Sequence, residues 1–343
     1  MSYKKRYTYI DIVKIVSILS VISIHVSAMY WYKTDIYSAR WCAMNFWNAL
    51  SRFCIGTFVM CTGVLFLNRE ELTYKELFKK YLFKLGVVFI IWMLIYSFIK
   101  NNYQMIGIIE NIKQKLPEGH LWFLIMIIGI YLILPIIRIF VKNAQKKDLE
   151  YFLLLSFIIQ SIIPFIIVFN QFSWLDIYYK LLYPSVVTGY VGVLVLGYYL
   201  NNYEINKKNK ILIMILGILS ILFTIFMNLY EARITGKPTT KFFKEYYPNI
   251  IIISMFVFVL IKCIVEKIKF SDKQKNVITE ISNSVFGIYL IHYLIIELVD
   301  IFGVNALMLN TYLAIPITTI IVFIFSLFIV LIMRKISIIN KFV

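Results

Sequence analysis

Apolar runs of about 20 residues recur along this chain between short polar connections, and each run is long enough to cross about 30 Å of hydrocarbon as a helix. We place ten such spans near residues 9–31, 45–67, 82–100, 120–141, 151–169, 183–200, 210–229, 248–266, 281–302 and 312–333. No segment between them is long enough for a soluble domain. The sequence therefore predicts an all-α integral membrane protein with ten transmembrane helices, in which residues 1–343 form a single polytopic domain.

The basic residues indicate how these helices are oriented. The net charge of +17 could suggest a nucleic-acid partner, but most of the 35 lysines and arginines fall on one side of the predicted membrane: the N-terminal tail, alternate loops and the C-terminal tail. Cytoplasmic loops carry such an excess. We therefore expect both termini in the cytoplasm, a multi-pass location in the cell (plasma) membrane among membrane lipids, and no nucleic-acid partner.

The first span, around VKIVSILSVISIH, contains charged and titratable side chains. An α-helix turns 100° per residue, so Lys14 and His25 lie only about 20° apart around its axis, and Asp11 lies about 60° from Lys14. These residues predict a polar stripe along one helix face. They also interrupt the apolar region that a cleaved signal peptide would need, so we expect the span to be retained.

Each polar group in this stripe has a structural alternative. Lys14 could extend its ammonium to the cytoplasmic headgroups while pairing with Asp11, and His25 could bond a neighbouring helix. However, an ionisable group in hydrocarbon is costly and normally faces the bundle interior or a water-filled cavity, where it usually has a function. The stripe is therefore a candidate route between the two aqueous phases.

Further polar residues lie in or beside other spans. Arg52 enters the second span at the predicted depth of His25, where its guanidinium could hold an anion or a hydroxyl or simply reach the outer surface. His292 lies near the middle of the ninth span, with Tyr289 one turn earlier on roughly the same face. It could have a function or could form a helix–helix hydrogen bond. His120 and Trp122 open the fourth span, where they could line an outer entrance or belong to an interfacial aromatic belt.

The sequence KELFKKYLFK places several lysines, including Lys80 and Lys84, at the predicted cytoplasmic start of the third span. They could bind lipid phosphates or a phosphate-rich cytosolic donor such as a coenzyme A thioester. Motifs for nucleotide binding, zinc proteolysis and the serine nucleophile elbow are absent from the sequence, and the four cysteines form no C-x-x-C pair. We therefore expect no metal.

The order of these motifs resembles the membrane acyltransferase-3 family, integral O-acyltransferases that modify cell-envelope polysaccharides. The resemblance rests on Ile10-Asp11-x-x-Lys14 with His25, on Arg52 leading into FVMCTGVLFL, on HLWFL at 120–124 and on FGIYLIH at 286–292. The sequence departs from the family at Thr62-Gly63, where Ser-Gly is usual. It also has Tyr81-Leu82-Phe83-Lys84 where an Arg-x-x-Arg pair is common.

This resemblance implies transfer of an acyl group, most simply acetyl from acetyl-CoA as donor substrate, to a cell-envelope glycan acceptor. It implies that His25 is the general base or a transient carrier, that Asp11 holds Lys14, and that Arg52 stabilises the oxyanion or orients the acceptor. Lys80, Lys84 and Lys14 would hold the acyl-CoA. His120, Trp122, Tyr289 and His292 would lie on the acceptor side or be structural.

Two other functions remain open from the sequence. A transporter or flippase for a lipid-linked saccharide or a small anion could use the same polar stripe without acyl-transfer chemistry. A non-catalytic membrane partner of a synthase would need neither Lys14 nor His25. The basic and aromatic outer loop EARITGKPTTKFFKEYYPN could contact a glycan or belong to an interfacial belt.

Overall fold

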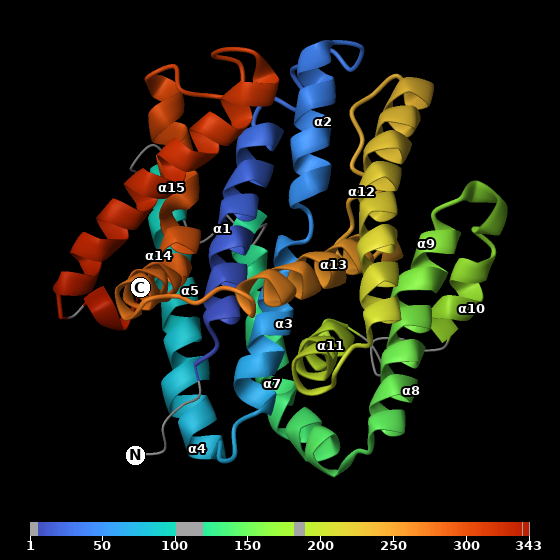
Figure 1. Ribbon diagram of the computed structural model, residues 1–343. Helices are drawn as coiled ribbons and strands as arrows, with labels where there is room; N and C mark the ends of the chain where they lie inside the picture. Colours follow the sequence, from blue (N-terminus) through green and yellow to red (C-terminus); the bar gives the residue numbers. More distant parts are fainter. Residues whose placement is uncertain (1–5, 101–118, 182–188, 338, 343) are drawn as a thin grey trace. The chain divides into compact units, whose positions relative to one another are not determined.

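The computed structural model describes residues 6–100, 119–181, 189–337 and 339–342 (Figure 1). These residues form helices, turns and loops, and no strand is found among them. The chain divides into two compact units. The first comprises Met1–Leu65 and Gln145–Ile332, and the second comprises Phe66–Ala144 and Met333–Val343.

Nine helical stretches of the described residues are long and apolar enough to cross a membrane. They are Thr8–Ala28, Ala39–Leu67, Tyr74–Lys100, Gly119–Asn143, Lys146–Ile167, Lys207–Thr235, Pro248–Val265, Asp272–Ile301 and Thr311–Lys335. Each coincides with one predicted span, which confirms the all-α membrane class. The remaining predicted span, 183–200, overlaps the short helix α11 (Val191–Asn202), and residues 182–188 lie outside the described part. The tenth crossing and the cytoplasmic termini therefore stay predictions.

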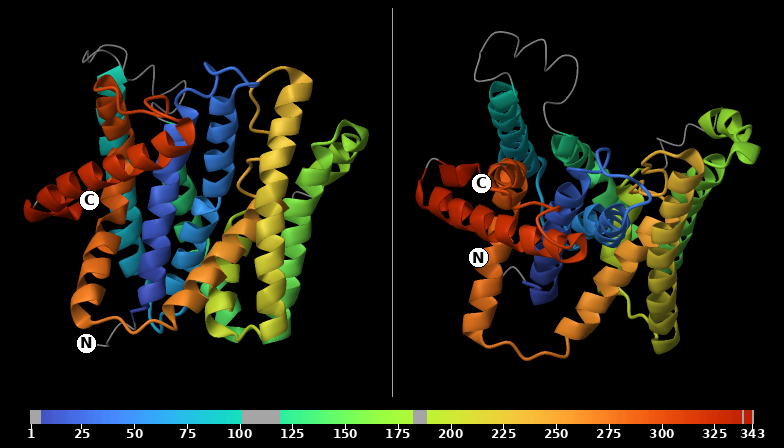
Figure 2. Two further views of the ribbon diagram at one scale, coloured as in Figure 1. Left: turned by 45° about the horizontal axis from the view of Figure 1, so that its top comes forward. Right: turned by 90° about the horizontal axis from the view of Figure 1, so that it is seen from above.

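The first unit is built around helix α1 (Thr8–Ala28), which packs against α2 (Ala39–Ser51) and α14 (Asp272–Ile301). Helix α12 (Lys207–Thr235) packs against α13 (Pro248–Val265), and the two helices cross at a steep angle (Figures 1 and 2). The first unit also contains α8 (Lys146–Ser156), the π-helix η3 (Phe157–Ile162), α9 (Ile163–Ile167), the 3₁₀ turn η4 (Asn170–Phe172), α10 (Leu175–Leu181), α11, and most of α3 (Cys54–Leu67) and α15 (Thr311–Lys335).

Local sequence signals explain where several of these helices begin and end. Ser38 caps α2 by accepting a hydrogen bond from the Trp41 amide, and Ser271 forms a capping box with Gln274 at the start of α14. Helix α12 ends at Gly236, whose φ of 66° lies in the left-handed region that glycine adopts most readily. Such caps satisfy the backbone groups that a helix end leaves unpaired.

The loop after α12 turns inward. Phe242 and Phe243 are at most 1% exposed, so they are core residues and not members of an interfacial belt. Two buried asparagines hold this loop: Asn228 donates to the Thr239 carbonyl oxygen at 2.9 Å, and Asn249 donates to that of Phe242 at 3.0 Å. Phe242 and Phe243, which suggested an interfacial belt, therefore pack inside the unit.

The second unit contains α4 (Tyr74–Glu76), the π-helix η1 (Leu77–Leu82), α5 (Phe83–Lys100), the 3₁₀ turn η2 (Gly119–Leu121), α7 (Trp122–Asn143) and the 3₁₀ turn η6 (Ile339–Lys341). Arg138 on α7 is 8% exposed and donates to the carbonyl oxygens of Arg69 and Leu72, at 2.5 and 3.2 Å. These bonds satisfy part of a buried guanidinium and fix the connection that precedes α4.

Asp11 joins α1 to α14. Its carboxylate accepts hydrogen bonds from Arg6 Nε at 2.7 Å and from Ser282 Oγ at 2.6 Å, and Asp11 is 4% exposed. The expected pairing of Asp11 with Lys14 is wrong, because Arg6 and a hydroxyl on α14 occupy the carboxylate instead. Asp11 therefore stabilises the packing of the helix that carries His25.

We expect Asp11→Ala to lower the free energy of unfolding by about 1–3 kcal/mol, since the Ser282 hydroxyl and the Arg6 guanidinium lose a charged partner. Thermal unfolding of the protein in detergent measures this change. The control is Asp272→Ala, because the Asp272 side chain is 98% exposed and should contribute under about 0.5 kcal/mol. Equal melting temperatures for the two variants would contradict the role of Asp11.

Candidate functional site

Two histidines from different helices meet in the first unit. His25 lies in the last turn of α1 and is half-buried, while His292 on α14 is fully buried. Their ring centroids are 5.2 Å apart, and the ring of Tyr293 lies 5.6 Å from that of His25. The packing of α1 along α14 thus brings together two of the predicted site residues.

The orientation of His292 is set by its own helix. Its Nδ1 lies 2.7 Å from the carbonyl oxygen of Tyr289, one turn earlier. A carbonyl oxygen can only accept, so Nδ1 carries the proton and Nε2 presents its lone pair in the neutral ring. Tyr289 is also buried, with its ring 5.9 Å from the imidazole, so these two residues share a face as predicted.

Arg52 lies where α2 ends and α3 begins. Its Nε donates to Asn48 Oδ1 at 2.7 Å, its Nη1 lies 3.9 Å from Glu245 Oε1, and its guanidinium is 4.6 Å from the centre of the Phe243 ring. Glu245 and Phe243 come from the inward-turning loop after α12. The three contacts hold the guanidinium in place from two sides.

A hydrogen-bonded connection links Arg52 to the end of α1. Asn48 accepts from Arg52 and donates through Nδ2 to Ser27 Oγ at 3.0 Å, and Ser27 lies two residues after His25. We call His25, His292 and Arg52 the histidine–arginine cluster.

The face of α1 between Lys14 and His25 points into the protein. Ser17 and Val21 are buried on it, and Ser17 shares a 2.6 Å hydrogen bond with Thr57 on α3. Lys14 is half-buried and forms no hydrogen bond or ion pair with the described part of the chain. The predicted stripe therefore faces the bundle interior, with an ammonium at one end and an imidazole at the other.

The remaining candidates belong to the second unit. Lys80 is exposed and pairs with Glu76 at 3.6 Å, and Lys84 follows on the next turn of the segment that contains η1. His120 is 3% exposed and packs its ring 5.1 Å from that of Tyr96, so it is a core residue and not a member of an interfacial belt. Trp122 is half-buried against Phe123.

The second unit also holds an arginine that the sequence did not single out. Arg69 donates to the Tyr81 hydroxyl at 2.8 Å, lies 3.6 Å from Glu76 and stacks 4.4 Å from the centre of the Phe66 ring. The segment after it is π-helical from Leu77 to Leu82, a conformation that is rare and frequently found at functional sites. Within the described residues no three metal-ligating side chains cluster.

Sequence reasoning missed several neighbours of the histidine–arginine cluster. Asn48 could have been found, because it precedes Arg52 by one helical turn and both would share a face. Glu245 and Phe243 could not, because they lie far along the chain in a loop that looked exposed. Tyr293 was indistinguishable from the other aromatic residues of its span.

The model for the acyltransferase domain of the acyltransferase-3 family matches residues 7–334, which include every residue of the histidine–arginine cluster. The chain belongs to this family. Comparison with curated proteins and with solved structures gives no match. Family membership and the apolar helices make this acyltransferase a multi-pass membrane protein.

Proposed function

We propose that this acyltransferase moves an acetyl group from cytosolic acetyl-CoA to a hydroxyl of a cell-envelope saccharide or polysaccharide at the plasma membrane. Family membership supports the reaction class. The observation that carries the mechanism is the histidine–arginine cluster, in which hydrogen bonds through Asn48 and Ser27 connect a guanidinium held in place to the helix end that carries the His25 imidazole. Acyl transfer to a hydroxyl needs both groups.

In the proposed reaction, His25 takes the proton of the acceptor hydroxyl as the oxygen attacks the thioester carbonyl. A tetrahedral oxyanion forms, and the Arg52 guanidinium stabilises its charge. Collapse breaks the carbon–sulfur bond, and the proton on His25 passes to the departing coenzyme A thiolate. In a two-step form of the same reaction, His25 carries the acyl group on a ring nitrogen before the acceptor receives it.

The neighbours of the cluster act by positioning. Asn48 and Glu245 orient the guanidinium, and the Tyr289 carbonyl keeps His292 in one tautomer beside His25. Asp11 contributes by fixing α1 against α14. Acceptor-side roles for Trp122 and His120 stay proposals, and the burial of His120 against Tyr96 favours a structural role.

For the donor, we propose that Lys80 and Lys84 receive the phosphates of acetyl-CoA. The exposure of Lys80 supports this role, because its ammonium can exchange the weak Glu76 contact for a phosphate. Lysine binds phosphate as a point charge without the planar fork of arginine. Lys14, which has no ion-pair partner in the described chain, would attract the donor near the cytoplasmic end of α1.

The test is the acyl-ester content of envelope glycans in cells that carry the intact chain or His25→Ala at equal membrane expression. We expect esters with the intact chain and a background level with the variant. Unchanged ester content in the variant would overturn the proposed function.

Replacing Arg52 with lysine keeps the charge but removes the guanidinium that Asn48 and Glu245 hold. We expect ester formation to fall by about 10²–10³-fold, the usual loss when one oxyanion donor is removed. The rate of ester formation in membranes that contain equal amounts of each protein measures this loss. The control is Arg233→Lys on the exposed outer part of α12, which should leave the rate unchanged. Equal rates in the two variants would remove Arg52 from the mechanism.

A further inference from the structure

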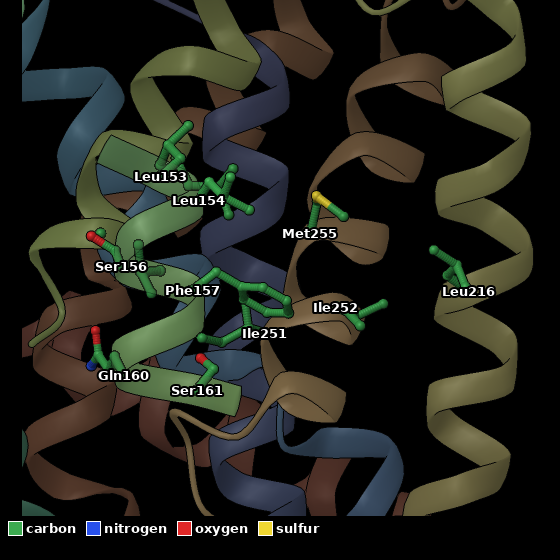
Figure 3. Close-up of a pocket in the computed structure, with 13 residues that line it drawn as sticks. Leu153, Leu154, Ser156, Phe157, Gln160, Ser161, Leu216, Ile251, Ile252 and Met255 are labelled. Carbon is green, nitrogen blue, oxygen red and sulfur yellow. The ribbon is translucent and has the colours of Figure 1, made fainter. Parts of the chain in front are cut away.

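A cavity of about 350 Å³ lies within the first unit, apart from the histidine–arginine cluster (Figure 3). Residues of α8, η3, α11, α12 and α13 line it, and most of them are apolar, among them Leu153, Leu216 and Met255. Its volume falls at the lower end of the range of about 300–1,000 Å³ that small-ligand pockets occupy. The cavity is therefore large enough for a bound molecule.

The cavity opens toward the surface that faces lipid. Leu154 on α8 is 58% exposed and Leu216 on α12 is 37% exposed, and both line it. In a membrane-spanning helix, apolar side chains exposed in this way contact hydrocarbon. A ligand of this cavity can thus come directly from the bilayer.

Two serine hydroxyls in the lining have no hydrogen-bond partner among the described residues. Ser156 is 4% exposed and Ser161 is fully buried. Other helical serines of this unit satisfy their hydroxyls locally; Ser254, for example, donates to the carbonyl oxygen of Ile250 at 2.8 Å. A buried hydroxyl without a partner is destabilising, so Ser156 and Ser161 favour a ligand that carries an acceptor oxygen.

Two of the three polar side chains that line the cavity lie toward one end of it, with Phe157 and Ile251 nearby. Figure 3 shows Leu153 and Leu154 at one end and Gln160 and Ser161 at the other, along α8 and η3. The basic residues predict a cytoplasmic N-terminus, which places the start of α8 at the inner side of the membrane and the cavity end with Gln160 and Ser161 toward the outer leaflet. An outer-leaflet glycerolipid has the same polarity, with its ester oxygens outward and its chains directed to the membrane centre.

We propose that this cavity binds one fatty acyl chain of an outer-leaflet glycerolipid. The chain lies along Leu153, Leu216 and Met255, and the ester carbonyl oxygen accepts a hydrogen bond from Ser161. The ligand thus satisfies a buried hydroxyl and fills an apolar volume that neighbouring helices leave open. This site is independent of the acyl-transfer reaction.

The test uses the full-length protein in vesicles of phosphatidylglycerol that carries a diazirine in one acyl chain. After illumination, we expect lipid attached to peptides that contain residues 153–161 or 251–255. Met255→Trp fills the cavity and should lower this labelling at least about tenfold. The matched control is Leu219→Trp, at a 55% exposed position on α12, which should leave it unchanged.

A second variant covers the case in which Met255→Trp fails to fold. Ser161→Ala removes the hydroxyl without adding bulk, and we expect labelling to fall about 2–10-fold, as for the loss of one hydrogen bond. A parallel arm replaces the phospholipid probe with a diazirine-bearing polyprenyl phosphate. Preferential capture of that probe, or equal labelling of both tryptophan variants and the intact protein, would overturn the proposal.

Discussion

Replacing His25 with glutamine should lower ester formation by about 10²–10⁴-fold, the usual contribution of a general base. Glutamine keeps hydrogen-bonding groups and a similar reach, but it cannot accept the proton of the acceptor hydroxyl. His25 is only half-buried at the end of α1, so the change should leave insertion and folding intact. Initial rates in membranes, at equal protein amounts, measure the loss.

Two further histidine variants make this prediction specific. His292→Gln removes the ring that lies 5.2 Å from that of His25. It should reduce the rate by a smaller factor, because His292 positions the His25 ring and does not itself take the proton. His120→Gln changes a buried histidine of the second unit and should affect stability more than rate. The double variant of His25 and His292 should be no slower than His25→Gln alone.

The same substitution separates acyl transfer from transport. A carrier of a saccharide or anion needs hydrogen-bonding groups along its path but no side chain that accepts a proton from a reacting hydroxyl. Glutamine at position 25 should therefore preserve transport. Retention of full ester formation by His25→Gln would therefore contradict the proposed mechanism. Loss of ester formation with normal membrane levels would leave the transport hypothesis without support.

The sequence was sufficient to predict where most helices lie. Apolar runs must become helices in a membrane because hydrocarbon offers no hydrogen-bond partner to an open backbone. Periodicity also placed Tyr289 and His292 on one face, as the structure confirms. These predictions depend on local geometry alone, which a single sequence contains.

Contacts between distant segments could not be predicted in this way. Lys14 is three residues from Asp11 and looked like its partner, but the carboxylate binds Arg6 and Ser282, since the packing of α14 on α1 brings a hydroxyl to it. Likewise, Phe243 and Glu245 reach Arg52 only because the loop after α12 turns inward. The expectation of an interfacial belt failed for Phe242 and Phe243, because composition does not show which way a side chain points.

Helices α3 and α11 contact each other through two glycines. A Cβ atom added to Gly63 would lie 1.9 Å from the Leu194 carbonyl oxygen, and one added to Gly197 would lie 2.2 Å from that of Met60. These neighbours are backbone atoms, which cannot rotate away as a side chain would. Small residues at both positions are therefore what lets the two helices approach so closely.

We expect Gly63→Ala to destabilise the protein by about 3 kcal/mol, at the upper end of the range for overpacked cores. Gly129→Ala is the matched control, because it too lies within a helix but has no atom within 4 Å of the added Cβ. There alanine should stabilise by about 0.5–1 kcal/mol, since it favours the helix more than glycine does. Thermal unfolding in detergent compares the two. The opposite signs make the test decisive: a neutral or stabilising Gly63→Ala would show that α3 and α11 do not meet through these glycines.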